Sequence, residues 1–347
     1  MDTLPATRSR RSPLPRGRRG RSDEDPHRGG SGTLGQRIAA DFAGRGDEAV
    51  VLTRSPRDDF PFRQIAWDGR TVGAWAGELE GSVLINLAGE VVDRPPTQRN
   101  IEMLRRSRVE PTRALVQASQ TCKPSPVVWV QASSTAIYGD AGDIVITEEA
   151  PIPQGPPQMP GVALPWEQAA KAATSERLVI FRMSLVLDTN TPVLDRLSML
   201  VKLGLGGRIS TGRQWVSWIH VRDMLRALRF VVNSEIEGVV NVTSPHPVQN
   251  ETLMKELRRH LNRPWSPPTP TPLVKLGAWF MGSDPAIALT GRRCVPARLL
   301  ESGFDFELPD LRSAFDDLFG PRTVRGPRVG TTQRNRWSNL RDRKSGG

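Results

Sequence analysis

The first half of the chain alternates between helical and extended hydrophobic patterns. Leu34, Ile38 and Phe42 recur every fourth residue, which predicts a helix over residues 33–44 with one apolar stripe. Short apolar runs of strand type follow at 49–53, 62–67, 83–88, 127–132 and 178–182. A long polar helix is expected over about 97–120, kinked or split at Pro111. Near-continuous apolar strands separated by helices predict an α/β fold with a parallel sheet covered on both faces.

The second half has a different character. Helical patterns occupy 192–204, 222–233, 250–262 and 309–319, and loops rich in Pro, Thr and Ser occupy 244–250 and 264–272. We interpret residues 191–320 as a smaller mixed α/β substrate lobe that ends in a small domain at about 265–319. Residues 29–190 are then the sheet domain.

The net charge of +11 belongs to the two ends of the chain. Residues 1–28 carry +4 and residues 321–347 carry +7, so residues 29–320 are formally neutral. Both ends are poor in strong hydrophobes, and we expect them to be disordered. A neutral body argues against specific nucleic-acid binding, although the tails alone could still bind anions in a salt-dependent way.

Several classes of protein are not supported. No run of 18 apolar residues suggests a membrane span, and no apolar segment follows the N-terminal arginines as in a secretory signal, so a cytoplasmic protein is expected. Cys122 and Cys294 are far apart and predict two buried thiols. The four histidines are too scattered to indicate a metal site.

A glycine-rich loop precedes the first predicted helix. Gly29, Gly32 and Gly35 have the three-residue spacing that lets a backbone approach a pyrophosphate before a helix N-terminus. The strand at 49–53 then ends in Thr53 and Arg54, and an arginine there suits the 2′-phosphate of NADP better than the ribose hydroxyl of NAD. The alternative is a flexible linker followed by a solvated charge.

The segment before that loop does not fit the same pattern. A phosphate-binding loop should follow a buried strand, yet residues 22–28 (SDEDPHR) contain no apolar run, and Pro26 cannot donate to a strand ladder. The expected fold is therefore a Rossmann-type doubly wound parallel sheet whose first strand is degenerate or missing.

Ordered motifs from about residue 29 to 319 resemble the YfcH-like epimerase family, an atypical branch of the extended short-chain dehydrogenase/reductase superfamily. They are NLAGE at 86–90, SRV at 107–109, ASSTAIYG at 132–139, GLGG at 204–207, GRQWVSWIH at 212–220 and PARLLESGF at 296–304. The resemblance implies an NADP-binding domain, a small substrate lobe and a reaction on a small polar metabolite. An oligomer is compatible with it.

Carried over to this chain, the resemblance implies a cofactor site with two parts. One part is the glycine loop with Thr53 and Arg54. The other comprises Leu87 and Ala88 at a strand end, with Arg108 reaching in from the following helix. Leu87, Ala88 and Arg108 also have a purely structural alternative. Residues at strand ends often belong to the core, and Arg108 could be a surface charge.

The catalytic pair of the superfamily is missing. Hydride-transferring members use Tyr-x-x-x-Lys, in which the lysine lowers the pKa of the tyrosine. The corresponding positions fall near Met159 and Ala163, in a proline-rich stretch that is expected to forbid a regular helix. The remaining catalytic candidates are Ser134, Tyr138 and His220. Packing is an alternative role for Tyr138 and His220.

Two functions follow from these residues. The first is an NADP-dependent epimerase-like oxidoreductase or isomerase with an unidentified small polar substrate. The second is a protein that binds NADP without catalysis, which the missing pair would explain.

Overall fold

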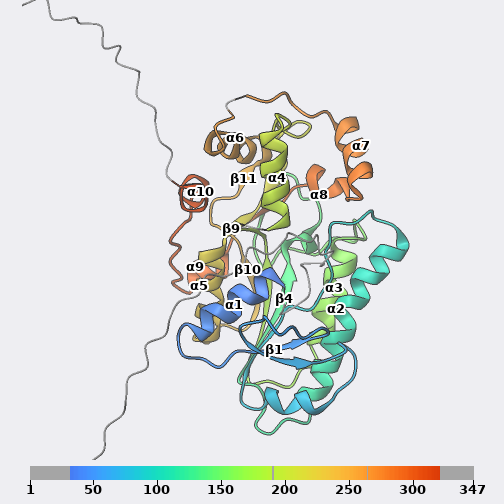
Figure 1. Cartoon of the computed structure of the whole chain (residues 1–347), viewed down its shortest axis with the longest axis vertical. Helices are drawn as coiled ribbons and strands as arrows, with labels where there is room; N and C mark the ends of the chain where they lie inside the picture. The colour runs from blue at the N-terminus through green and yellow to red at the C-terminus, as the bar shows by residue number, and fades with distance from the viewer. Residues whose placement is uncertain (1–31, 190, 264, 321–347) are drawn as a thin grey trace, which may run out of the picture.

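The computed structural model describes residues 32–189, 191–263 and 265–320 (Figure 1). The predictions for segments 1–28 and 321–347, and for Gly29, concern residues outside the described ones. The elements of the first half are α1 (Thr33–Ala43), β1 (Val50–Thr53), β2 (Arg63–Ala66), η2 (Ala74–Leu79), β3 (Val83–Asn86), α2 (Gln98–Ser119), β4 (Val128–Ser134), η3 (Thr135–Tyr138), β5 (Val145–Ile146), α3 (Pro160–Ala170) and β6 (Leu178–Met183).

The central sheet is parallel and four-stranded. Its strand order is β10-β6-β4-β3, where β10 is Gly238–Val242. β1 and β2 form a separate parallel pair, and no hydrogen-bonded pairing between β1 and β3 occurs among the described residues. In a Rossmann order the first strand lies between these two. The segment 22–28 that would supply it falls outside the described residues.

The side chains of β4 alternate between the two faces of the sheet. Val128 and Val130 join the hydrophobic cluster that contains α1 and α5 (Val221–Val232), whereas Trp129 joins the cluster that contains α2. Figure 1 shows α1 and α5 on one side of β4, and α2 and α3 on the other. Because a strand presents successive residues to opposite faces, this apolar run is buried on both sides. The predicted doubly wound α/β fold is confirmed.

Two helices connect the β1–β2 pair to the central sheet. On one face, Ile38 of α1 packs in the cluster of β4, and Ala39 packs with Val51 of β1. On the other face, Leu52 of β1 contacts the cluster that holds Leu115 of α2. The apolar contacts of α1 and α2 thus hold the β1–β2 pair against the elements of the central sheet, with no ladder between β1 and β3 among the described residues.

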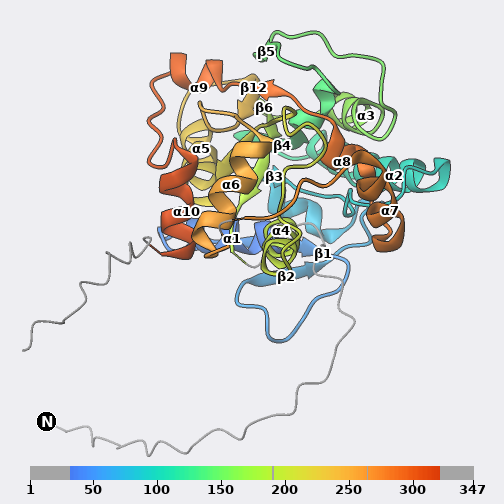
Figure 2. The same ribbon diagram turned by 90° about the horizontal axis from the view of Figure 1, so that it is seen from above.

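The second half contains the remaining elements. They are β7 (Leu185–Leu187), α4 (Pro192–Lys202), β8 (Trp215–Val216), β9 (Trp218–His220), α5, β10, β11 (Val248–Gln249), α6 (Asn250–His260), α7 (Thr271–Met281), α8 (Pro285–Leu289), β12 (Arg293–Cys294), α9 (Ala297–Glu301) and α10 (Leu311–Phe319). β7 pairs with β9 and β5 with β12, both in parallel, and β8 pairs with β11 in antiparallel fashion. Figure 2 shows α10 lying against α6.

Three expectations need correction. The 238–242 segment was assigned to the substrate lobe, but it forms β10 and pairs with β6 in the central sheet. α2 is not split at Pro111 and runs as one helix from 98 to 119. The proline-rich stretch does not exclude a helix, because α3 begins at Pro160, where the first turn needs no N–H donor from proline.

His220 begins α5 as its N-cap. Its Nδ1 accepts a hydrogen bond from the backbone N–H of Arg222 at 3.1 Å, and its Nε2 lies 3.3 Å from Oδ2 of Asp317 on α10. The side chain is 1% exposed. Burial lowers the pKa of the imidazole below its ordinary value, and the charge of Asp317 opposes that shift only in part. The neutral ring is therefore the form that caps the helix.

The packing of α10 gives a first prediction. Phe315 is fully buried in the cluster that joins α10 to α6, whereas Arg312 on the same helix is exposed. Phe315→Ala should lower the free energy of unfolding by about 3–5 kcal/mol, because it removes a buried ring and leaves a cavity. Arg312→Ala is the matched control and should change it by less than about 0.5 kcal/mol. Urea unfolding measures both, and equal losses would contradict the packing.

The capping role of His220 gives a pH prediction. Because the pKa is lower in the folded chain, the folded state binds fewer protons than the unfolded one. Neutral His220 makes its full contribution to the free energy of unfolding above about pH 6.5. That contribution is lost as the pH falls through the lower pKa of the folded state. His220→Asn keeps a capping acceptor that does not titrate. Urea unfolding between about pH 8 and pH 5 should show a steeper loss of stability for the wild type than for His220→Asn; identical slopes would refute this.

Candidate functional site

A hollow of about 500 Å³ lies at the C-terminal ends of β1 and β3. Thr53 and Arg54 line it from the end of β1, and Ala88, Gly89 and Glu90 line it from the loop after β3. Parallel strands end at the same edge of a sheet, and this edge is where doubly wound folds bind ligands. The structure therefore brings three of the predicted cofactor residues, Thr53, Arg54 and Ala88, to one cavity.

The charges that line this hollow occur largely in pairs. Arg54 donates to Glu90 Oε1 at 2.9 Å, and both Arg70 and Arg106 donate to Glu110 at 2.8 Å. The hydrogen bond from Arg106 is the main reason that the pKa of Glu110 lies below its ordinary value. The Arg54 side chain is half-exposed, so part of it remains open to solvent.

Asn86 shapes the loop after β3. Its Nδ2 donates to Thr112 Oγ1 at 2.8 Å and to Gln131 Oε1 at 2.9 Å, and its Oδ1 accepts from the Ala88 backbone N–H at 3.1 Å. Asn86 itself is 2% exposed. A buried amide with all these partners fixes the direction in which the chain leaves the strand. Sequence reasoning treated the asparagine only as part of a motif.

Arg108 reaches this loop from α2, but it binds protein atoms there. Its guanidinium donates to the backbone oxygens of Leu104 at 3.0 Å and Glu90 at 2.8 Å, and to Ser107 Oγ at 3.2 Å. Burial lowers its pKa to about 10, against the opposing charge of Glu90. A Cβ added at Gly89 would lie 2.9 Å from Arg108 Cζ, which explains the glycine. Arg108 does not line the hollow, so its predicted contact with a cofactor stays a prediction.

The glycine loop enters the described structure at Gly32. This residue is the N-cap of α1 and provides no side-chain cap, so the first-turn amides are not capped from that position. Gly32 lines a second hollow of about 230 Å³, together with Thr33 and Asp188. Asp188 also binds Arg37 of α1 through two hydrogen bonds of 2.9 and 3.0 Å. Gly35 is buried within α1.

Leu87 is a core residue, which was the alternative to its predicted contact with a cofactor. It packs against the hydrophobic cluster of β4 and α5 and does not line the 500 Å³ hollow. Its contribution to cofactor binding stays a prediction.

The three catalytic candidates lie in very different environments. Ser134 ends β4, and its Oγ accepts the Ala136 N–H at 3.2 Å, which leaves the hydroxyl proton available for another acceptor. Tyr138 is 3% exposed, donates to Asn241 Oδ1 at 2.9 Å and accepts from Arg182 at 2.8 Å. Burial raises the pKa of Tyr138 to about 12, so it holds its proton near neutral pH. His220 is buried as the cap of α5.

The positions of the missing pair carry no acid or base. Met159 is the residue before the first turn of α3, and Ala163 lies in its second turn; both are buried. Thioether and methyl groups cannot exchange a proton. Any proton transfer at this edge of the sheet must therefore involve other groups.

A buried ionic network lies behind Ser134 and was not predicted. Arg182 of β6 binds Glu167 of α3 through two hydrogen bonds of 2.8 Å, and Ser133 Oγ donates to the same carboxylate at 2.5 Å. Arg182 also stacks over the Tyr138 ring, with its Cζ 5.0 Å from the centroid. The network joins β4, β6 and α3 and holds the strand end that carries Ser134. No local sequence signal distinguishes these charges from surface charges.

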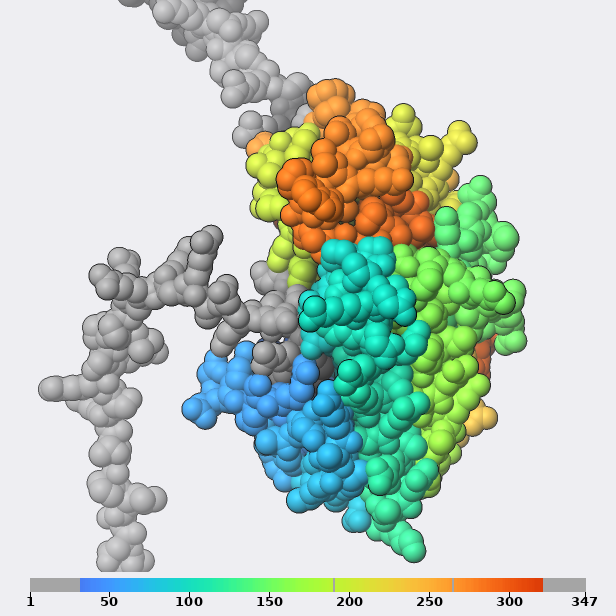
Figure 3. Space-filling model, turned by 90° about the vertical axis from the view of Figure 1, so that its right-hand side faces the viewer, coloured from blue at the N-terminus to red at the C-terminus, as the bar shows by residue number. Residues whose placement is uncertain are grey.

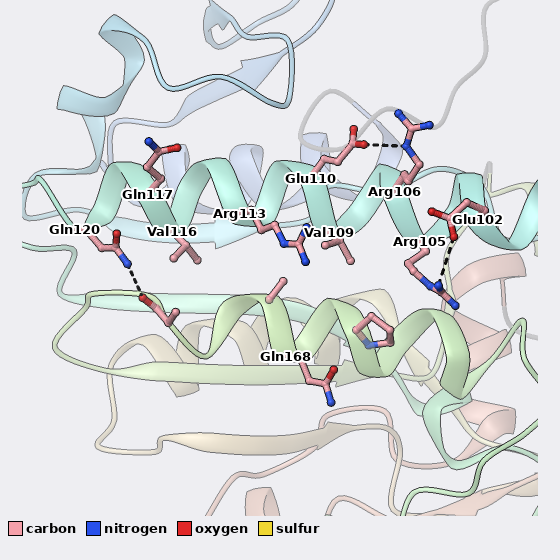
Figure 4. A pocket seen from close by; sticks show the side chains of 13 residues that line it. Glu102, Arg105, Arg106, Val109, Glu110, Arg113, Val116, Gln117, Gln120 and Gln168 are labelled. Carbon is pink, nitrogen blue, oxygen red and sulfur yellow. Dashed lines mark hydrogen bonds and ion pairs between the residues drawn. The ribbon is translucent and has the colours of Figure 1, made fainter.

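A third hollow, about 750 Å³, lies between α2 and α3 on the face seen in Figure 3. Figure 4 shows the side chains that line it, with pairs between Arg106 and Glu110 and between Arg105 and Glu102. None of the predicted site residues lines this hollow, although Glu102, Arg106 and Glu110 line both it and the 500 Å³ hollow.

The described residues offer neither a membrane span nor a metal-binding cluster. Among residues 32–189, 191–263 and 265–320, no helix has the length and apolar character needed to cross a bilayer. The same residues contain no cluster of three or more His, Cys, Asp or Glu side chains suited to a metal ion. Cys122 and Cys294 are both buried, as their spacing predicted.

Comparisons with known proteins agree with this geometry. Epimerase family protein YfhF of Bacillus subtilis is 30% identical over 300 residues, which are 85% of this chain and 97% of that protein. Epimerase family protein SDR39U1 of Bos taurus is 28% identical over 296 residues, 84% of this chain and 97% of that one. The crystal structure of isoform 2 of human SDR39U1 with NADPH superposes with a TM-score of 0.74 at 26% identity, covering 83% of this chain and 96% of that chain.

Two protein-family models match this chain, one over the sheet domain and one over the C-terminal segment. A domain of unknown function (DUF1731) matches residues 269–318, within the C-terminal segment that was predicted to form a small domain. The model described as NAD dependent epimerase/dehydratase family matches residues 28–243, well over half of the sequence. The chain therefore belongs to the NAD dependent epimerase/dehydratase family.

Proposed function

We propose that this chain binds NADP(H) across the C-terminal edge of its sheet. The observation that carries the proposal is the position of Arg54, whose half-exposed side chain lines the 500 Å³ hollow beside Thr53 and Ala88. A cation at the end of the second Rossmann strand suits a 2′-phosphate. The presence of NADPH in the human SDR39U1 structure supports the same cofactor.

The pyrophosphate of the cofactor would lie at the N-terminus of α1. The amides of the first turn of α1, which receive no side-chain cap from Gly32, are donors of the kind that bind a pyrophosphate. The missing side chain at Gly89 makes room for Arg108, which in turn holds the loop that faces the adenosine part. When bound, a nicotinamide cofactor supplies hydride exchange, and the chain itself orients the substrate.

The proposed reaction is epimerase-like redox or isomerisation chemistry on a small polar metabolite. Ser134 is the residue we assign to substrate orientation, because its hydroxyl proton is free to donate to a substrate oxygen. The Arg182–Glu167 pair holds the strand end beneath it. We do not assign proton transfer to Tyr138, because it is buried and already donates its hydroxyl proton to Asn241.

A second function, cofactor binding without turnover, is favoured by one observation. Met159 and Ala163 occupy the positions of the Tyr–Lys pair, and neither side chain can act as an acid or base. If this second function holds, the chain would bind NADP(H) as in the first function but would not convert any substrate.

Arg54→Ala tests the cofactor assignment. Loss of a charge-assisted contact to the 2′-phosphate should weaken NADPH binding about 10- to 100-fold, while NADH binding should change by less than about threefold. Arg57→Ala is the matched control, because Arg57 is exposed, pairs with Asp59 and does not line the hollow. Isothermal titration calorimetry measures all four affinities. A folded wild-type chain that binds no NADPH would refute the proposal.

Ser134→Ala distinguishes the two functions. Turnover of a panel of aldehydes, ketones and nucleotide sugars, followed by the nicotinamide absorbance, should fall about tenfold or more, because one hydrogen bond to the reacting oxygen is lost. Ser134→Thr keeps a hydroxyl and should retain turnover. Unchanged turnover in Ser134→Ala would remove the role assigned to Ser134. Intact NADPH binding without turnover of any compound by the wild type would favour the second function.

A further inference from the structure

An acidic side chain faces the arginine to which the cofactor phosphate is assigned. Glu90 Oε1 accepts a hydrogen bond from Arg54 Nη2 at 2.9 Å, and the two side chains come from different strand ends of the same hollow. The carboxylate is 18% exposed and the arginine 53% exposed. A 2′-phosphate that approaches Arg54 therefore meets a guanidinium whose charge is already compensated.

Glu90 cannot withdraw by moving its backbone. Its N–H donates to Ser107 Oγ at 3.1 Å, and its carbonyl oxygen accepts from Arg108 at 2.8 Å. Both partners belong to α2, and Arg108 is buried. The carboxylate is shared with a second cation, since Arg94 Nη2 lies 3.7 Å from Oε2, but its shorter contact is the one to Arg54 at 2.9 Å.

The remaining arginines of the hollow do not relieve this competition. Arg70 and Arg106 share Glu110, each at 2.8 Å. Arg99 has no ion pair within 4.0 Å among the described residues, but it lies in the first turn of α2 and not at the end of β1. Arg54 is thus the cation that a 2′-phosphate at the second strand end would share with Glu90.

We propose that Glu90 determines cofactor preference: its carboxylate opposes the 2′-phosphate of NADPH at Arg54 and offers an acceptor to the ribose 2′-hydroxyl of NADH. This inference rests on the proposed cofactor site. Enzymes of this fold usually place either an acid, for the hydroxyl, or an arginine, for the phosphate, at this point. Here both are present and bound to each other, so the chain accepts both cofactors with a narrow preference.

The electrostatic reasoning sets the direction of the effect. A phosphate monoester carries a charge of about −1.5 to −2 near pH 7, so a carboxylate a few ångströms away repels it. The 2′-hydroxyl of NADH is neutral and donates a hydrogen bond, which a carboxylate accepts well. Replacing Glu90 by glutamine keeps the shape and a carbonyl acceptor but removes the charge.

Titration of wild type and Glu90→Gln with NADPH and with NADH tests the proposal. In Glu90→Gln the Kd for NADPH should fall about three- to tenfold, and the Kd for NADH should stay constant or rise up to about threefold. Since the hollow is open to solvent, the gain should shrink as the salt concentration rises. Glu90→Ala should shift the ratio of the two Kd values in the same direction.

Two controls separate the local effect from a general one. Glu78→Gln removes one negative charge from an exposed Arg63–Glu78 pair outside the hollow and should leave both Kd values unchanged. In the Arg54→Ala background, Glu90→Gln should lower the Kd for NADPH relative to NADH by a smaller factor than in the wild type, because competition for the shared cation is gone and only the direct repulsion of the phosphate remains.

The outcomes are distinct. A ratio unchanged within twofold overturns the inference and would direct attention to another cation such as Arg99. Weaker NADPH binding in Glu90→Gln also overturns it, since the carboxylate would then be orienting Arg54 for the phosphate. In both cases wild-type NADPH binding leaves the proposed function intact. A wild type that binds neither cofactor removes the inference and the proposed function together.

Discussion

The burial of β4 on both faces is the constraint on which the rest of the structure depends. Val128 and Val130 require α1 and α5 on one side, and Trp129 requires α2 on the other, because an apolar strand exposed on either face would leave its side chains in water. The same two layers of helices hold the β1–β2 pair against the elements of the central sheet, although no ladder joins β1 to β3 among the described residues. The edge at which a ligand would bind is therefore positioned by side-chain packing from both faces.

Polar contacts then define the details of that edge. Asn86 directs the chain as it leaves β3, and Arg108 holds the following loop through the Glu90 carbonyl oxygen. The glycine at 89 is required because Arg108 fills the space of a side chain. As a result the Glu90 carboxylate stays next to Arg54, and a site for an anion contains its own anionic competitor. The proposed cofactor affinity and the proposed cofactor preference would thus depend on the same few hydrogen bonds.

Two of the catalytic candidates suggested by the sequence, Tyr138 and His220, have structural roles. Tyr138 is held by Arg182 and Asn241 in a buried network, and His220 caps α5. Both side chains are buried and hydrogen-bonded to other protein groups, whereas Ser134 lies at the end of β4 and is only partly buried. The chain keeps the sheet edge of its family but has Met159 and Ala163 where relatives with a Tyr–Lys pair have an acid and a base.

The sequence by itself determined the parallel α/β layers, the helix after the glycine loop, and Arg54 at the end of β1, because each depends on local periodicity or on a residue at a strand terminus. β10 escaped prediction because five residues carry too little periodic signal, and the sheet partner that makes them a strand is β6, far away in the sequence. α3 was missed because prolines were expected to exclude a helix, whereas Pro160 occupies the first turn, where no N–H donor is needed, and Pro165 is accommodated within the helix. Only the tertiary structure decided that Glu90 faces Arg54, that Arg108 is buried against the loop, and that Glu167 pairs with Arg182. These contacts join residues 15 to 36 positions apart through packing of different elements, and charge pairing at such separations leaves no pattern along the chain.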